Sequence, residues 1–366
     1  MKKRLGLLGG GQLASLIASS AVKRDFEISA YCDSIDDPIV SLCQDLFVGE
    51  RDDKINLKNF FQSVDLVCLE SEFFDVDLLV ELQKETGTKV YPELADYKKL
   101  YTKKNQKTLM DTLGIDYAKT FNTSVNVSLQ YPLVLKMSHG GYDGYGNKIV
   151  HSKEELDGLR LDQRFSDAFL EEKLDLKNEY ACLLVKGLQD EFIFDPCLTV
   201  QQDQKCLFVE DGERVSSLVK SAIKERVQKI SDALSGPGVY AFEFFETLDG
   251  RILFNEAAPR VHNSFHFSIE GYSYSQFDMF INAIVDSELY MPTRRYLNLT
   301  MLNIIGRDNG AYQLSFPYKE ELCPYKIHMY GKKESRPGRK LGHITFFDNQ
   351  NTTSESAKWV EKEYRL

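Results

Sequence analysis

The sequence predicts a mixed α/β and α+β fold, in which a parallel α/β domain at residues 1–100 precedes a largely antiparallel region. In the first domain apolar strands alternate with helical patterns: the strand at 4–8 runs into a glycine turn and a helix, and another buried strand lies at 66–70. Continuous apolar strands that alternate with helices are typical of a parallel sheet covered on both faces. From about residue 179 the apolar segments follow one another closely, which is typical of an antiparallel sheet.

The chain after residue 100 is expected to form two further domains. These are a small lid subdomain at 101–176, with a strand at 132–136 and a hairpin-like segment after it, and a C-terminal antiparallel α+β domain at 177–366. Helices are expected at about 75–85, 103–113, 215–234 and 274–285. Further strands are expected at 28–32, 89–91, 299–305, 326–330 and 343–347.

Composition is that of an ordinary globular protein. Of the 366 residues 43% are hydrophobic and 27% are charged, and the formal net charge is −10. An acidic chain does not suit a nucleic-acid backbone, although a local basic cluster can still bind a small anion. Because no hydrophobic leader and no apolar run of ~20 residues is found, we expect a cytoplasmic protein with no membrane partner. The seven cysteines form no CxxC pair and are expected to be buried, reduced thiols.

The glycine turn after the first strand is the first candidate for a ligand site. Gly9, Gly11 and Ala14 fit the pattern G-x-G-x-x-A between a strand and a helix, and Asp33 ends the next strand. In dinucleotide-binding proteins this spacing lets the backbone approach a pyrophosphate. A tight strand-to-helix turn needs small residues in any case, so both readings stay open.

A glycine-rich segment after the lid strand is the second candidate. Lys136 stands at the end of that strand, and four glycines occur between 140 and 146. A flexible glycine-rich hairpin can fold over nucleotide phosphates and present backbone N–H groups, while the lysine supplies positive charge. The segment is not a P-loop, because no GK[ST] opens a helix here. A plain glycine-rich turn is the alternative.

Two carboxylates on neighbouring strands are the third candidate. Glu243 and Glu256 are separated by the hairpin signal Asp249-Gly250, so the two acids can face each other, with Asn255 beside the second. Such a set of hard oxygen ligands suits Mg²⁺ together with nucleotide phosphates. A dense group of polar residues follows, as expected of an anion or substrate site: Arg260, His262, Asn263, Ser264 and His266.

A basic segment near the C-terminus is the fourth candidate. Five cationic side chains occur within residues 332–340, among glycine and proline residues that turn the chain. Such a cluster suits a phosphate or carboxylate ligand. In isolation it could equally be a solvated basic turn.

Together these features resemble the ATP-grasp superfamily and, within it, the N5-carboxyaminoimidazole ribonucleotide synthase family (PurK). The resemblance runs along the whole chain. The motifs that carry it are GGGQL at 9–13, the acids Glu70 and Glu72, GGYDGxG at 140–146, NExAPRxHNS at 255–264, SQF at 275–277, YGK at 330–332 and PGRKxGH at 337–343.

The resemblance implies an ATP-grasp fold with a Rossmann-like N-terminal domain, a homodimer, and a ligase that uses ATP and Mg²⁺. Its implied substrates are bicarbonate and aminoimidazole ribonucleotide, which react through carboxyphosphate. The implied ATP-binding residues are Lys103, Lys136, Gly141, Tyr142, Asp143, Gly144, Tyr145, Gly146, Asn147, Glu171, Glu172, Lys173, Leu174, Glu179, Asn255 and Glu256. The implied catalytic residues are Tyr142, Asp143, His262, Ser264, His266, Lys332 and Arg339. Glu72, Lys332, Arg339 and Lys340 are implied to bind the substrate, and Glu243 and Glu256 the metal.

The sequence departs from the family pattern in four places. Tyr145 stands where the flap usually carries a cation, Phe265 interrupts the HNSGH motif, Lys103 replaces an arginine, and a histidine near the nucleotide is missing from 199–201. Three rival functions follow: an ATP-grasp carboxylate–amine ligase with another acceptor, an NAD-dependent oxidoreductase, and a non-catalytic nucleotide-binding regulator.

Overall fold

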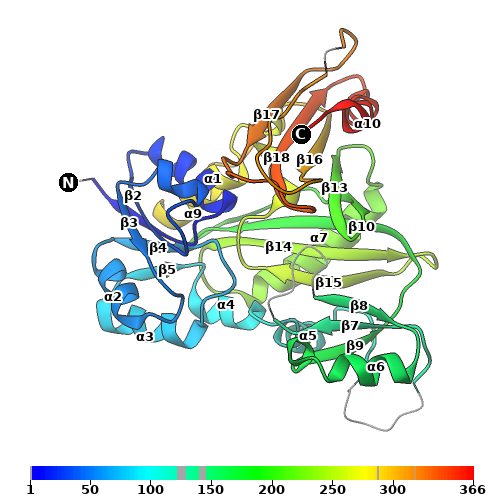
Figure 1. Ribbon diagram of the computed structural model, residues 1–366, viewed down its shortest axis with the longest axis horizontal. Helices are drawn as coiled ribbons and strands as arrows, with labels where there is room; N and C mark the ends of the chain where they lie inside the picture. The colour runs from blue at the N-terminus through cyan, green and yellow to red at the C-terminus, as the bar shows by residue number, and fades with distance from the viewer. Residues whose placement is uncertain (1, 122–128, 140–145, 287, 318) are drawn as a thin grey trace.

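The computed structural model describes residues 2–121, 129–139, 146–286, 288–317 and 319–366. Three β-sheets form its framework, and helices pack against them (Figure 1). The N-terminal sheet is parallel, whereas the other two sheets are antiparallel. The mixed fold class predicted from the sequence is therefore confirmed.

The N-terminal sheet has five strands in the order β3-β2-β1-β4-β5. They are β1 (Arg4–Leu8), β2 (Glu27–Cys32), β3 (Asp45–Val48), β4 (Leu66–Leu69) and β5 (Lys89–Tyr91). Its helical elements are α1 (Gln12–Val22), η1 (Pro38–Ser41), α2 (Lys54–Gln62), α3 (Val76–Thr86) and α4 (Leu94–Leu100). Every residue of β4 is buried, which explains its continuous apolar run. Because β1 and β4 are neighbours, the glycine turn after β1 lies beside Glu70, which follows β4.

The second sheet lies inside the predicted lid and has the order β6-β9-β7-β8. Its strands are β6 (Thr120–Phe121), β7 (Leu133–Met137), β8 (Asn147–Val150) and β9 (Ala168–Glu172). Helices α5 (Lys103–Leu113) and α6 (Lys153–Arg160) and the 3-10 turn η2 (Gln163–Phe165) accompany it. The antiparallel pairing of β7 with β8 confirms the predicted hairpin. Gly114 ends α5 with φ +63°, a left-handed conformation that glycine adopts readily.

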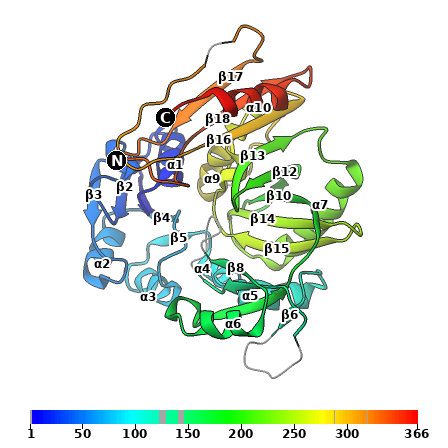
Figure 2. The ribbon, with the colours of Figure 1, turned by 45° about the vertical axis from the view of Figure 1, so that its right-hand side comes forward.

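The third sheet has nine strands and contains most of the C-terminal half of the chain. Its order is β15-β14-β10-β12-β13-β16-β18-β17, and β11 pairs with β10. The strands are β10 (Leu176–Lys186), β11 (Glu191–Ile193), β12 (Cys197–Gln202), β13 (Lys205–Asp211), β14 (Gly238–Thr247), β15 (Ile252–Ala258), β16 (Asn298–Ile305), β17 (Tyr325–Met329) and β18 (Lys340–Asp348). The helical elements are α7 (Ser217–Ala233), η3 (Asn263–Phe265), α8 (Ser268–Gly271), α9 (Gln276–Val285) and α10 (Thr353–Glu363). Figure 2 shows how this sheet curves beside the lid.

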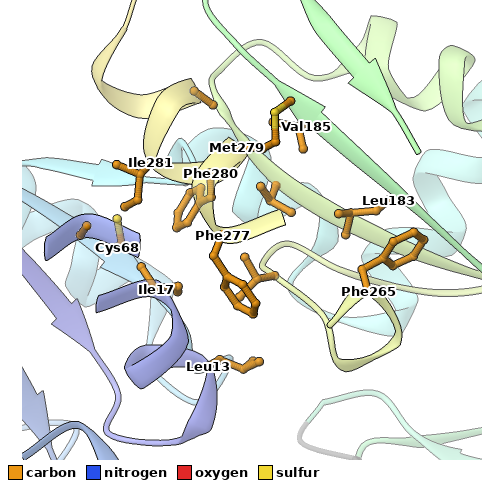
Figure 3. Packing of buried hydrophobic residues seen from close by; sticks show 14 of the residues in the cluster. Leu13, Ile17, Cys68, Leu183, Val185, Phe265, Phe277, Met279, Phe280 and Ile281 are labelled. Carbon is orange, nitrogen blue, oxygen red and sulfur yellow. The ribbon is translucent and has the colours of Figure 1, made fainter. Parts of the chain in front are cut away.

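A shared hydrophobic core joins the N-terminal domain to the large sheet. Helices α1 and α9 pack together, and Ile17 of α1 is buried in the same cluster as Phe280 of α9 and Leu183 of β10 (Figure 3). The capping box of Ser275 and Asp278 fixes the start of α9. This core therefore holds the glycine turn before α1 in place against the loop before α9.

Among the elements that the sequence did not predict are β3, α2, α4 and the C-terminal helix α10. The seven cysteines are free thiols, as expected. Among the described residues, no helix has both the length and the apolar character needed to cross a membrane. The predicted domain limits at residues 100 and 176 remain a proposal.

Candidate active site

A cavity of about 1170 Å³ is lined by residues of the lid sheet, of the large sheet and of the turns that follow strands of the N-terminal sheet. The glycine turn contributes Gly11, the lid sheet contributes Lys136, and the large sheet contributes Glu243 and Lys340. Most of the site residues predicted from the sequence line this one cavity. They are Glu72, Lys103, Lys136, Asn147, Glu171, Glu172, Lys173, Leu174, Glu179, Glu243, Asn255, Glu256, His262, Ser264, Lys332, Arg339 and Lys340.

The remaining predicted residues lie elsewhere. Gly141, Tyr142, Asp143, Gly144 and Tyr145 fall outside the described residues. Gly146 forms the turn before β8, where its carbonyl accepts a 2.9 Å hydrogen bond from the Met137 N–H. His266 is fully buried and does not line the cavity. The catalytic role implied for His266 stays a prediction, and its burial suits a residue that positions neighbouring groups.

Buried ion pairs organise the end of the cavity nearest the lid. On adjacent strands β7 and β9, Lys136 Nζ lies 2.6 Å from a carboxylate oxygen of Glu171. Lys107 Nζ, from α5, lies 2.5 Å from the other oxygen of Glu171 and 4.3 Å from the ring centroid of Tyr117. Burial favours a raised pKa for Glu171, but the two lysines outweigh it and lower that pKa. Glu171 is therefore a buried carboxylate that fixes two ammonium groups.

The carboxylate hairpin, formed by β14 and β15, places Glu243 directly opposite Glu256. Asn255 lies between the clusters: its amide oxygen accepts a 3.0 Å bond from Lys136 Nζ, and its amide nitrogen donates a 3.3 Å bond to Glu243. Lys103 pairs with Glu256. Burial and the neighbouring charge of Glu256 raise the pKa of Glu243. Two close acids and an amide oxygen form a site whose charge a cation would balance.

The polar segment after β15 is held by Gln276, the first residue of α9. Its side-chain oxygen accepts a 2.8 Å bond from the His262 N–H, and its amide nitrogen donates a 2.8 Å bond to the His262 carbonyl. The same nitrogen lies 3.0 Å from Nδ1 of the buried His266. Arg260 extends to the N-terminal domain, where its Nε lies 2.6 Å from Glu72. The Gln276 side chain thus fixes the backbone at His262, one of the residues implied to be catalytic.

His262 is placed to donate a hydrogen bond and is poorly suited to act as a base. Its Nδ1 accepts a 3.4 Å bond from the Ser264 N–H, which leaves the proton of the neutral ring on Nε2. That nitrogen lies 3.8 Å from Glu243. Burial, helped by Arg260 and Lys340, lowers the pKa of His262 to about 3. The ring is therefore neutral at physiological pH.

Residues 332–340, which we call the basic loop, lie at the opposite end of the cavity, which Lys332 and residues 336–340 line. Lys332 Nζ donates to the side-chain oxygen of Gln12 at 2.9 Å and to the carbonyl of Lys340 at 2.5 Å. Arg339 Nη1 donates to the carbonyl of Glu334 at 2.8 Å. Burial and the like charge of Arg336 lower the pKa of Arg339. Several cations held this close together favour a multiply charged anion.

The glycine turn accommodates a carboxylate of the protein itself. Gly9 has φ +118°, and a Cβ there would lie 2.2 Å from the side chain of Glu70. Glu70 accepts a 3.1 Å hydrogen bond from the Gly11 N–H. The Gly11 N–H, which would donate to a pyrophosphate, therefore already has Glu70 as its partner. Asp33, the second part of the dinucleotide pattern, pairs with Arg51 and does not line the cavity.

Sequence reasoning did not name Lys107, Gln276 or Gln12 as site residues. Gln276 and Gln12 lie within the SQF and GGGQL motifs, which could have singled them out. Lys107 lies in an ordinary amphipathic helix, and only the packing of α5 against the lid sheet reveals its partner.

Three family models match successive parts of the chain. They are the ribonucleotide synthetase preATP-grasp domain at 1–98, the ATP-grasp domain at 103–277, and the phosphoribosylaminoimidazole carboxylase C-terminal domain at 300–357. Similar curated proteins include the N5-carboxyaminoimidazole ribonucleotide synthases of Synechococcus elongatus and Staphylococcus haemolyticus. The first is 29% identical over 98% of this chain and 93% of its own, and the second is 29% identical over 99% and 97%.

Two similar crystal structures are of carboxyaminoimidazole ribonucleotide synthase from Aspergillus clavatus. The complex with ATP has a TM-score of 0.87 and 28% identity, covering 99% of this chain and 98% of that chain. The complex with ADP and 5-aminoimidazole ribonucleotide has a TM-score of 0.81 and 27% identity, with the same coverage.

Proposed function

We propose that this chain, which belongs to the N5-carboxyaminoimidazole ribonucleotide synthase family of the ATP-grasp superfamily, is an ATP-dependent carbon–nitrogen ligase of purine biosynthesis. It carboxylates 5-aminoimidazole ribonucleotide with bicarbonate and releases ADP and phosphate. The observation that carries this proposal is the single cavity. Its two ends hold a carboxylate–lysine cluster and a basic loop, as a reaction between ATP and a second phosphorylated substrate requires.

At the lid end, Lys136 would bind ATP phosphates, and Lys103 would add a second ammonium group beside Glu256. Segment 171–174 would line the adenine, and Glu179 would bind the ribose. The flap at 141–147, with Tyr142 and Asp143, would close over the phosphates and exclude water. These roles rest on the family resemblance and on the shared cavity.

A divalent cation fits the carboxylate hairpin. Glu243, Asn255 and Glu256 provide hard oxygen ligands, and burial together with the negative charge of Glu256 raises the pKa of Glu243. We propose Mg²⁺, which would neutralise charge on the ATP phosphates when bound. Lys103 would then release Glu256 and turn towards the nucleotide.

At the opposite end, Lys332, Arg339 and Lys340 would bind the 5′-phosphate of the ribonucleotide. The bonds of Lys332 to Gln12 and to the Lys340 carbonyl preorganise this site. Glu72, held by Arg260, would face the substrate from the N-terminal domain.

The chemistry consists of two displacements. A bicarbonate oxygen attacks the γ-phosphorus of ATP, and the bond to ADP breaks to give carboxyphosphate. The amine of the ribonucleotide then attacks the carbonyl carbon, loses a proton and expels phosphate. His262 would donate a hydrogen bond from Nε2 to an oxygen of bicarbonate, and Ser264 and the Gln276-held backbone would orient it.

Release of ADP with and without 5-aminoimidazole ribonucleotide tests this function. We expect the ribonucleotide to stimulate release and other amines to have little effect. Equal stimulation by another amine would favour a related ligase, and ATP binding without turnover would favour a regulator. The NAD-dependent alternative is disfavoured because Glu70 occupies the Gly11 N–H. The homodimer remains a proposal from the family resemblance, and the cytoplasmic location remains a proposal from the hydrophobic pattern of the sequence.

A further inference from the structure

A cluster of two histidines and one glutamate lies outside the catalytic cavity. His328 on β17 is paired directly across the strands with His343 on β18, and their rings stack with centroids 4.6 Å apart. Glu270 of α8 reaches the same point, where its carboxylate lies 2.8 Å from His328 Nε2. One donor atom from each of the three side chains lies within 4.8 Å of the others. None of the three lines the cavity.

Two donor atoms of this cluster are buried without a hydrogen-bond partner among the described residues. They are the second carboxylate oxygen of Glu270 and Nε2 of His343. Leaving a buried polar atom unpaired is costly, because the atom loses its hydrogen bonds to water and gains none in the protein. The other nitrogen of His343, Nδ1, lies 2.9 Å from the Tyr330 hydroxyl. A metal-binding histidine usually donates its second N–H in this way, which leaves its other nitrogen as a ligand.

The ligand types select the class of metal. Two imidazoles and one carboxylate form a set that Zn²⁺ uses with an open fourth position, whereas Mg²⁺ prefers oxygen ligands alone. A simple Glu–His ion pair would explain the contact between Glu270 and His328. It would not explain the two unpaired atoms, on Glu270 and His343. It would also not explain why His343, on the separate strand β18, lies at the same point.

We propose that Glu270, His328 and His343 form a second metal site, which binds Zn²⁺ or a similar transition-metal cation. The side chain of His328 is 27% exposed and lies on an edge strand, so an ion can enter from solvent. The site joins α8 to the two strands that flank the basic loop. It therefore braces the loop from outside the cavity.

Zinc binding can be measured by equilibrium dialysis with Zn²⁺ alone, in the full-length chain. The other substitutions are made in a Glu256→Gln background, which we call the parent. This background weakens cation binding at the carboxylate hairpin. We expect one Zn²⁺ per chain in this parent. His328→Ala should weaken it by more than ~100-fold, above the 10–100-fold typical of second-shell partners. The matched control is His151→Ala, an exposed histidine, which should change nothing.

Two further measurements keep the test decisive. Glu270→Gln removes the carboxylate while keeping its shape, and it serves as the second variant if His328→Ala fails to fold. Zn²⁺ should raise the unfolding midpoint of the parent but of neither variant. The proposal is overturned if the parent binds no Zn²⁺, or if both variants bind it as tightly as the parent.

Discussion

The two ends of the cavity hold their cations in different ways. At the lid end every lysine of the cluster meets a carboxylate: Lys107 and Lys136 share Glu171, and Lys103 pairs with Glu256. At the other end Lys332 donates hydrogen bonds to the Gln12 amide oxygen and to the Lys340 carbonyl, and Arg339 donates one to the Glu334 carbonyl. Lys333 of the same loop pairs with Asp36 outside the cavity.

This difference suggests how each end meets its ligand. Cations that already pair with carboxylates must exchange partners when ATP and a metal arrive, so binding there is coupled to a local rearrangement. The bonds of Lys332 and Arg339 to neutral oxygens hold these side chains in position, which prepares the basic loop for an incoming phosphate. Four substitutions can break or sharpen this comparison.

The largest effect is expected from Glu256→Gln, which removes one acid of the carboxylate hairpin and the partner of Lys103. Turnover should fall at least ~100-fold, equivalent to about 2.7 kcal/mol of barrier, while the fold persists. Steady-state ADP release at saturating Mg²⁺ measures it, with the exposed Glu213→Gln as control. Near-normal turnover would show that this acid does not support catalysis.

Arg339→Ala tests the opposite end. Loss of a charge-assisted hydrogen bond to phosphate should raise the KM for the ribonucleotide by about 10–100-fold. The KM for ATP should stay within about 2-fold, because the two phosphate sites are distinct. The control is Lys333→Ala, since Lys333 pairs with Asp36 and does not line the cavity. An equal loss for both substrates would contradict the division of the cavity into two ends.

A smaller effect is expected from Lys107→Met, which leaves Glu171 with Lys136 as its remaining lysine. The free energy of unfolding should fall by about 1–3 kcal/mol, the cost of a poorly compensated buried group. The KM for ATP should rise a few-fold, because Lys136 must leave a more strongly charged partner. Lys104→Met, on the exposed side of the same helix, is the control for denaturant unfolding. If neither the free energy of unfolding nor the KM for ATP changes, the shared pairing of Lys107 and Lys136 with Glu171 contributes to neither stability nor ATP binding.

The smallest effect is expected from Tyr145→Arg, which restores the cation usual in the flap. If the phenol is a tolerated replacement, ribonucleotide-dependent ADP release should stay within about 3-fold of wild type. A wild type without this activity and an arginine variant that gains it would show that the natural acceptor is a different amine. The ATP-binding end would keep its assignment in that case.

Local patterns made part of this structure predictable. The Asp249-Gly250 turn signal between two apolar runs was enough to expect that Glu243 and Glu256 face each other. The helix α10 was missed because three of its five buried positions, Thr353, Ser354 and Ser356, are polar, which leaves a short apolar stripe. Strand β3 was missed because it is short and not fully buried.

Contacts between distant segments could not be read from the sequence. The pairing of Lys107 with Glu171 depends on how α5 packs against the lid sheet. The group formed by Glu270, His328 and His343 joins three segments, and its register depends on the pairing of β17 with β18. The histidine motif also did not show that His266 is fully buried.

The order of strands in the large sheet has a geometric consequence for the reaction. The carboxylate hairpin forms one margin of that sheet, and β18, which begins at Lys340, lies next to the other margin. From β15 to β18 the sheet makes six steps between neighbouring strands, each a rotation of about 20–25°, so it turns through roughly 120–150°. We infer that this accumulated twist brings both margins to one cavity. It would thereby set the distance between the carboxylate hairpin and the basic loop.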